Sequence, residues 1–204
     1  LMELFCGGER MQPARWPNEG FAHYGEIVDP GYGLRDRSNP QAIAKFTYEG
    51  DRPERWRVED GVWLQGYWAR AYMCETVRVG KIDPIKKQID FAAPNTYGLD
   101  TWGAKRFFAI NVLEELDRPG EWFLDRKQRL LLFWPPADLK KTRTVVSVLD
   151  KPMISLTDAS YVTLDHLGLE DGRWDGVSIT NGAHNRIVGC TIRNVGHHAV
   201  EVNG

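Results

Sequence analysis

Three short segments set the pattern of this sequence: Ile154-Ser155-Leu156-Thr157, Val177-Ser178-Ile179-Thr180 and Val200-Glu201-Val202-Asn203. Each begins 23 residues after the one before it, and apolar residues alternate with polar residues in each. Alternation with a period of two is typical of β-strands, and a fixed repeat of about 20 to 50 residues is typical of a solenoid. The pattern therefore predicts an all-β fold built from the stacked coils of a parallel β-helix.

The same 23-residue step relates four further pairs of positions. These are Leu164 with Ile187, Leu167 with Cys190, Leu169 with Ile192, and Asp171 with Asn194. Equivalent positions on successive coils should form ladders about 4.8 Å apart, with the apolar ladders facing inward and Ser155, Ser178 and Glu201 facing outward. Asp171 and Asn194 suit a corner with left-handed backbone. A β-sandwich is the alternative, but it gives no reason for one period across five columns.

The rest of the chain divides by pattern into two further segments. We expect a first β-helix segment at 1–22 and an inserted β-barrel or sandwich domain at 23–136, followed by the coils of 137–204. The Gly7-Gly8 pair predicts a hairpin turn, and residues 144–149 are expected to re-enter the coil with Val146 and Val148 inward. Asn111 and Glu114 have the spacing of a capping box, which predicts a short helix near 112–117 with Leu113 and Leu116 on its buried face.

Composition excludes several classes of partner. The net charge is −2, and no basic patch is present, so nucleic acid is not an expected partner. No stretch reaches the roughly 20 apolar residues of a membrane helix. We interpret Cys6, Cys74 and Cys190 as unpaired thiols, because their spacing matches neither a disulfide framework nor a zinc site.

Several motifs resemble those of a known family. Residues 2–5 and the run Arg15-Trp16-Pro17-Asn18-Glu19-Gly20-Phe21 resemble the opening of bacterial right-handed parallel β-helix proteins. Residues 116–125, containing Pro119-Gly120-Glu121-Trp122, and residues 133–136 are similar to their link between insertion and coil. The order of these parts along nearly the whole chain resembles glycoside hydrolase family 141 and its uncharacterised relatives.

The resemblance implies both an architecture and an activity. It implies a right-handed β-helix with a β-rich insertion domain, acting on plant polysaccharide as a fucosidase or xylanase, in a secreted or periplasmic setting. The family's chemistry is thought to use carboxylates on later coils. We therefore expect this chain to be an N-terminal portion that is inactive alone, and no catalytic residue is carried over from the family.

The residues themselves offer one mixed cluster for glycoside hydrolysis. Asp175 and His198 share a column of the repeat, and Glu201 lies three residues further on. Two carboxyl groups about 5–9.5 Å apart are needed. Three strand residues span roughly 10 Å, so Asp175 and Glu201 are too far apart unless a bend at Gly176 shortens the path. One interpretation is a solvated Asp–His hydrogen bond, and the other is a sugar-binding cleft in which Asp175 orients His198.

Metal and cofactor sites are not expected from this sequence. Adjacent residues on a strand point to opposite faces, which argues against joint metal binding by His197 and His198. No group of several Asp residues falls on one coil, which argues against calcium.

Tryptophan is the other candidate group, with eight residues in the chain. Trp63, Trp68 and Trp102 are candidate sugar-stacking residues in the insertion, although a small β-domain also needs large aromatic side chains in its core.

Three functions remain open. The first is a glycoside hydrolase whose insertion shapes one wall of the substrate groove, and the second is a non-catalytic carbohydrate-binding module. The third is a polysaccharide lyase, for which Arg173, Arg186 and Arg193 are available but form no ordered row. All three have a polysaccharide or oligosaccharide as partner.

Overall fold

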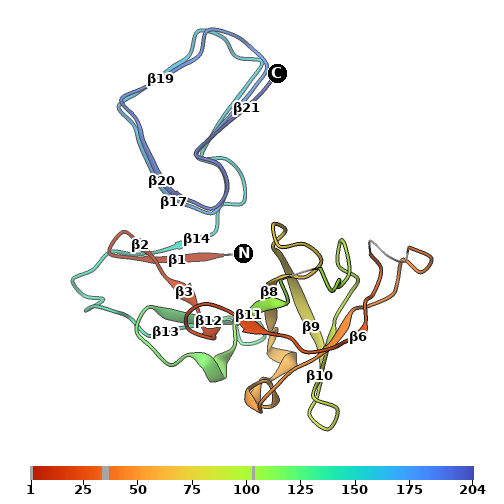
Figure 1. The fold of residues 1–204 in the computed structure, drawn as a ribbon. Helices are drawn as coiled ribbons and strands as arrows, with labels where there is room; N and C mark the ends of the chain where they lie inside the picture. Colours follow the sequence, from red (N-terminus) through yellow and green to blue (C-terminus); the bar gives the residue numbers. More distant parts are fainter. Residues whose placement is uncertain (1, 34–36, 103) are drawn as a thin grey trace. The chain divides into compact units, whose positions relative to one another are not determined.

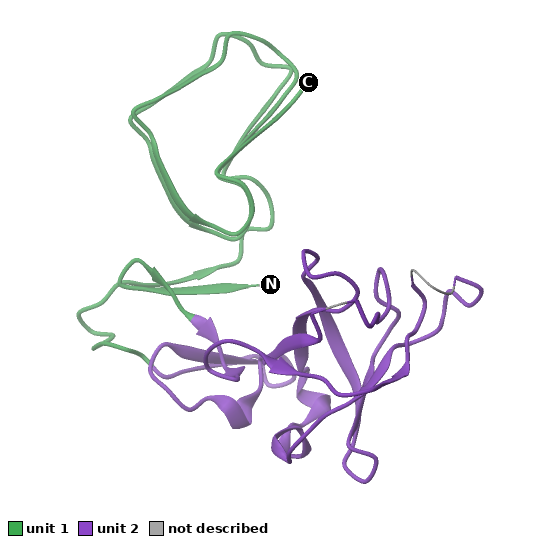
Figure 2. Ribbon diagram, in the orientation of Figure 1, with its two compact units in different colours: residues 1–11, 135–204 green, residues 12–134 purple. Residues whose placement is uncertain are grey.

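The computed structural model describes residues 2–33, 37–102 and 104–204, and these residues form an all-β protein. Two compact units are present, one formed by residues 1–11 and 135–204 and the other by residues 12–134 (Figure 2). Regular helix is confined, in the described chain, to short 3-10 turns. We describe each unit by itself, beginning with the one that contains the repeat.

The 23-residue repeat forms three separate parallel sheets. The first contains β15 (Ile154–Thr157), β18 (Val177–Thr180) and β21 (Val200–Asn203). The second pairs β16 (Thr163–Asp165) with β19 (Arg186–Val188), and the third pairs β17 (Gly168–Gly172) with β20 (Thr191–Val195). Successive repeats follow almost the same path, so that each strand lies beside its equivalent (Figure 1).

The register of these sheets confirms the predicted columns. Ile154 pairs with Val177 and Val177 with Val200, while Leu164 pairs with Ile187 and Leu169 with Ile192. The apolar side chains of these columns are buried only in part. Val177, on the central strand, is fully buried, but Val200 and Val202 on the edge strand β21 are 39% and 68% exposed. A central strand has neighbours on both sides, whereas an edge strand has one.

Asp171 and Asn194 occupy the predicted corner. Both have left-handed backbone, with φ of 60° and 55°, and the Asn194 amide donates a 3.0 Å hydrogen bond to Asp171 Oδ1. The Leu167/Cys190 column differs from its expected inward position. Leu167 is 38% exposed, and its backbone N–H approaches Cys190 Sγ at 3.5 Å. The Cys190 thiol therefore contacts backbone polar groups rather than acting as a purely apolar core residue.

The antiparallel sheet of this unit corrects one prediction. Its strand order is β14–β1–β2, with β14 at Thr144–Ser147, β1 at Glu3–Cys6 and β2 at Glu9–Arg10. The expected hairpin at Gly7-Gly8 is present, and both glycines have positive φ. However, β14 pairs antiparallel with β1 instead of joining a parallel coil, so Val146 and Val148 are 41% and 68% exposed and Ser147 is buried.

The second unit is built on an eight-stranded sheet with the order β4–β11–β8–β9–β10–β7–β6, in which β5 also pairs with β11. The order does not close on itself, so the sheet is open rather than a barrel. Its strands are β4 (Arg15–Trp16), β5 (Ala22–His23), β6 (Ile27–Asp29), β7 (Lys45–Thr47), β8 (Trp63–Tyr67), β9 (Glu75–Asp83), β10 (Gln88–Phe91) and β11 (Arg106–Ile110). A three-stranded sheet adds β3 (Gln12–Pro13), β12 (Glu121–Asp125) and β13 (Leu130–Phe133). The predicted hairpin of β12 and β13 is thus confirmed.

Aromatic side chains fill the core of this unit. Trp68 packs edge-to-face on Phe91, with ring centroids 5.0 Å apart, and stacks on Phe46 and Phe107. Each of these four side chains is at most 1% exposed. A Cβ atom at Gly66 would lie 2.7 Å from the Trp68 ring, so the indole requires glycine two residues earlier, within β8. Trp68 is therefore a core residue, which excludes it as a sugar-stacking surface.

The predicted helix is a 3-10 turn whose buried residue is a carboxylate. The three 3-10 turns are η1 (Arg52–Arg55), η2 (Val58–Asp60) and η3 (Leu113–Glu115). The capping box is wrong, because η3 has no side-chain cap and Asn111 instead bonds the backbone of Leu124. Leu113 and Leu116 are half-buried, while Glu115 is fully buried. Its carboxylate accepts hydrogen bonds from Arg52 and, at 2.8 Å, from Trp56 Nε1, which satisfies the buried charge.

Two other expectations concern the whole described chain. Cys6, Cys74 and Cys190 are free thiols, as predicted. No helix in the described residues is long and apolar enough to cross a membrane.

Candidate functional site

The candidate site lies where two successive repeats turn between strands. Asp175 lies between β17 and β18, and His197 and His198 lie one repeat later, between β20 and β21. Three backbone hydrogen bonds join these turns to their neighbours: Met153 N–H to Asp175 O, Gly176 N–H to His198 O, and Val177 N–H to Ala199 O, at 2.9–3.1 Å. Asp175 is therefore held directly beside the two histidines.

Two glycines allow the turns to approach this closely. A Cβ atom at Gly176 would lie 2.7 Å from the Ala199 carbonyl oxygen, and one at Gly196 would lie 2.3 Å from the Arg173 carbonyl oxygen. Neither position can hold a larger residue without moving backbone. The sequence Asp175-Gly176 and the sequence Gly196-His197-His198 thus specify the local packing as well as the chemistry.

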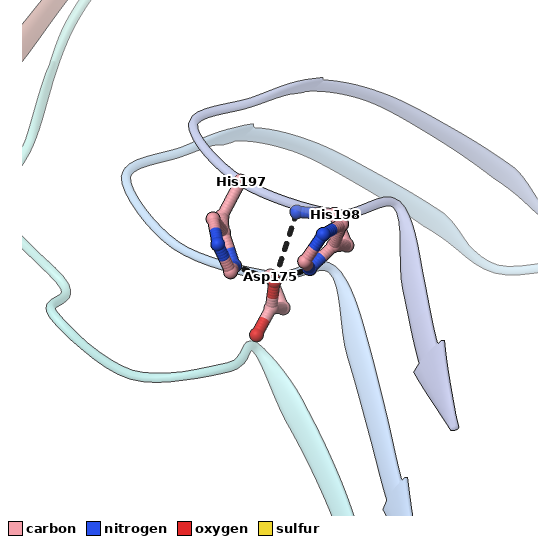
Figure 3. Close-up of side chains that lie close together, drawn as sticks. All are labelled: Asp175, His197 and His198. Atoms are coloured by element: carbon pink, nitrogen blue, oxygen red, sulfur yellow. Dashed lines mark hydrogen bonds and ion pairs between the residues drawn. The ribbon is translucent and has the colours of Figure 1, made fainter. Parts of the chain in front are cut away.

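The Asp175 carboxylate is the centre of the cluster. Its Oδ1 lies 2.8 Å from His197 Nδ1, accepts a 2.8 Å hydrogen bond from the His198 backbone N–H, and lies 3.4 Å from His198 Nδ1. Figure 3 shows both imidazole rings turned towards this carboxylate. The Asp175 side chain is 1% exposed, whereas those of His197 and His198 are 46% and 53% exposed. A buried carboxylate thus orients two solvent-accessible imidazoles.

This arrangement refines the predicted Asp–His contact and corrects one argument behind it. The closer imidazole partner of Asp175 is His197, while His198 bonds mainly through its backbone N–H. The adjacent histidines do not point apart. They lie in a bend before β21 rather than on a strand, and their ring centroids are 3.9 Å apart. The alternation of side chains therefore does not apply to them.

Hydrogen bonding sets the charge state of Asp175. Burial alone would raise its pKa, because a low-dielectric environment disfavours the ionised form. The His198 backbone N–H, the His197 hydrogen bond and the charges of both imidazoles outweigh that effect and hold the pKa of Asp175 below its ordinary value. Asp175 is therefore a carboxylate at neutral pH.

Glu201 extends the cluster through His198. The His198 Nδ1 atom lies 4.0 Å from Glu201 Oε1 and 3.4 Å from Asp175 Oδ1. The two carboxylate oxygens are therefore separated by at most the sum of 3.4 and 4.0 Å, or about 7.4 Å. The estimate of about 10 Å along a straight strand is too long, because the chain bends between Gly196 and Ala199.

Aromatic pairs line the same repeat and were missed by reasoning from the sequence. Trp174 stacks on His197, with ring centroids 5.1 Å apart and planes 28° apart. Tyr161 stacks on His184 in the same way, at 4.7 Å and 21°. The members of each pair are 23 residues apart, so the repeat step applied to aromatic residues would have found both. Trp174 and Tyr161 are 43% and 76% exposed.

The remaining tryptophan candidates, Trp63 and Trp102, belong to the unit of residues 12–134. Trp63 lines a hollow of about 300 Å³ with Arg78, Arg126 and Lys127 in the second unit. Trp102 is 75% exposed, with the Arg70 guanidinium 5.9 Å from its ring centroid. Both therefore remain accessible to solvent.

The cluster also has the composition of a metal site. One ligand atom from each of Asp175, His197 and His198 lies within 4.8 Å of the other two. Two imidazoles and a carboxylate are a donor set that suits zinc and related transition metals. As it stands, the arrangement can shuttle a proton through an oriented imidazole, bind a sugar through its polar and aromatic groups, or hold such an ion.

Comparison with known proteins yields one structural likeness. The chain matches no family model and no curated protein sequence. It is similar to a solved structure described as "Glycoside hydrolase", with 13% sequence identity and a TM-score of 0.50. The match covers 87% of this chain and 30% of that protein, so this chain spans less than a third of its length. At this identity the likeness shows a shared fold.

Proposed function

We propose that this chain is part of a carbohydrate-active protein of the glycoside hydrolase type, acting on plant-type polysaccharide. The likeness of fold to a solved glycoside hydrolase over most of the chain is the observation that carries the proposal. The 23-residue parallel register further supports the interpretation that the segment from β15 to β21 belongs to the coils of a right-handed parallel β-helix, with a β-rich domain inserted before it.

The contribution of this chain is a sugar-contacting surface around the Asp175 bend. Trp174 and His197 offer a flat, half-exposed aromatic pair, while His198 and Glu201 add exposed polar groups beside it. Sugar sites combine such an apolar platform with a few oriented polar groups. Asp175 acts as a positioning residue, because its buried side chain cannot reach a substrate directly.

Two other functions are weighed against this one. A non-catalytic carbohydrate-binding module is favoured by the Trp174–His197 and Tyr161–His184 stacks, since these give a surface without requiring chemistry. A polysaccharide lyase is less well supported, because the guanidinium of Arg193 forms a 2.6 Å ion pair with Glu170. An arginine engaged in this way is poorly placed to bind an acidic sugar.

Calorimetric titration with xylo-oligosaccharides and fucosylated oligosaccharides tests the sugar surface. Trp174→Ala and His197→Ala should weaken binding, while Trp134→Ala, a ring of similar exposure in the other unit, should leave it unchanged. Trp63→Ala and Trp102→Ala test whether the inserted domain takes part. Equal losses in Trp174→Ala and Trp134→Ala, or no binding by the unmodified chain at millimolar sugar, would overturn the assignment.

Release of reducing sugar separates hydrolysis from binding alone. If the bend carries acid–base chemistry, His198→Ala and Glu201→Gln should reduce turnover by a much larger factor than they weaken sugar binding. Binding without turnover in the unmodified chain would show that these residues supply a binding surface without the chemistry.

A further inference from the structure

We infer that Asp175, His197 and His198 form a binding site for a divalent transition metal of the zinc class. This inference does not rest on the carbohydrate proposal, because it depends only on the donor atoms and their geometry. The three residues come from two turns that the repeat places side by side, and each presents one donor atom to the same small volume (Figure 3).

The distances between donors suit a small ion. Two ligands bound about 2.1 Å from a tetrahedral zinc ion lie about 3.4 Å apart. The distance from Asp175 Oδ1 to His198 Nδ1 is 3.4 Å, and that to His197 Nδ1 is 2.8 Å. The shorter distance is that of a hydrogen bond, and it must lengthen by about 0.6 Å when a metal ion replaces the proton.

The surroundings permit that change. His197 and His198 are half-exposed residues of a bend, so their rings can adjust, while Asp175 is fixed by burial and by the His198 backbone N–H. That N–H supports the carboxylate from outside the metal shell and orients the ligand. Solvent reaches the imidazole side of the cluster, which leaves a position for water on the ion.

The donor types select the metal. Two imidazole nitrogens disfavour Ca²⁺ and Mg²⁺, which prefer oxygen ligands, and favour Zn²⁺, Co²⁺, Ni²⁺ or Cu²⁺. Three protein ligands and an open position are typical of a zinc site that holds a water molecule. Because the metal would occupy both Nδ1 atoms and Asp175 Oδ1, metal binding and proton transfer through Nδ1 of either histidine would exclude one another.

Titration of the metal-free chain with Zn²⁺ and Co²⁺ tests the site. We expect saturable one-to-one Zn²⁺ binding by calorimetry, and a visible Co²⁺ absorption of the strength that four-coordinate cobalt gives. His197→Ala and His198→Ala should each weaken binding by at least about tenfold. The matched control is His184→Ala, which removes an exposed, ring-stacked histidine outside the cluster and should leave the affinity unchanged. Ca²⁺ should not compete.

Outcomes that overturn the inference are equally definite. Absence of saturable binding by the unmodified chain would do so, as would an equal loss of affinity in His184→Ala. The two histidine variants change half-exposed side chains, and circular dichroism of each variant is recorded first to check that it folds. Asp175→Asn serves as a third variant only if it passes the same check. Sugar titration is measured separately, so failure of metal binding leaves the carbohydrate proposal unaffected.

Discussion

The two units of this protein are stabilised in different ways. In the unit of residues 12–134, Trp68, Phe46, Phe91 and Phe107 converge on a single core contributed by strands far apart in the sequence. Among the described residues of strands β15 to β21, Val177 is the one apolar residue that is fully buried. Each of these strands pairs with its equivalent strand one repeat away. A convergent core is sensitive to single side chains, whereas a repeat distributes its stability over neighbouring contacts.

Removing the central indole should give the largest effect. Trp68→Ala should lower the free energy of unfolding of its unit by about 3–5 kcal/mol, because it deletes a buried aromatic side chain and leaves a cavity. Trp102→Ala, which removes an exposed ring from the same unit, should change it by less than about 0.5 kcal/mol. Urea denaturation followed by circular dichroism measures both, and similar losses would show that the aromatic cluster is not the main support.

Loss of the buried carboxylate should rank next. Glu115→Ala leaves the Arg52 guanidinium and the Trp56 N–H without their acceptor, and we expect a cost of about 2–3 kcal/mol. Arg52 is 35% exposed, so water offsets part of the loss. The control is Glu114→Ala, which breaks the exposed pair with Arg57 and should cost at most about 1 kcal/mol. A larger effect at Glu114 would contradict the assignment of Glu115 as the structural carboxylate.

The repeat gives a smaller and more local effect. Val177→Ala removes two methyl groups from the buried central strand and should destabilise the repeat unit by about 2 kcal/mol. Val202→Ala, on edge strand β21 and 68% exposed, should cost less than about 0.5 kcal/mol. Hydrogen exchange of the amides in β15 and β18 would locate the loss. Equal effects at the two positions would mean that the repeat does not bury its ladders on central strands.

The same contrast explains what the sequence could predict. The register of Ile154, Val177 and Val200 follows from a local rule, since parallel repeats place equivalent residues together whatever surrounds them. Val146 was misplaced because alternation alone does not choose which face of a strand is buried, and pairing with β1 reversed the choice. The insertion was identified as β-rich, but its open strand order depends on long-range pairing that no local pattern encodes.

The candidate site was likewise predictable only where the repeat determines which residues are neighbours. The repeat step brought Asp175 and His198 together correctly, because both occupy the same column. The alternation of side chains on a strand predicts that His197 and His198 point apart, but the bend between Gly196 and Ala199 brings the His197 ring to Asp175. The same 23-residue step relates Trp174 to His197, so it also predicts their stack once it is applied to aromatic residues.

The smallest expected effect is on the pH dependence of the repeat unit. The pKa of Asp175 is held below its ordinary value of 3.8, so the folded state favours the ionised carboxylate. This contribution to stability is fully present above about pH 4 and is lost as the pH falls through the lower pKa of the folded state. Thermal unfolding between about pH 5 and pH 2.5 should therefore show a smaller decline for Asp175→Asn, and for His197→Ala, than for the unmodified chain. His184→Ala lacks any contact with Asp175 among the described interactions and should decline like the unmodified chain. An unchanged decline in Asp175→Asn would mean that the two histidines do not stabilise its charge, and that the bend is held by backbone pairing alone.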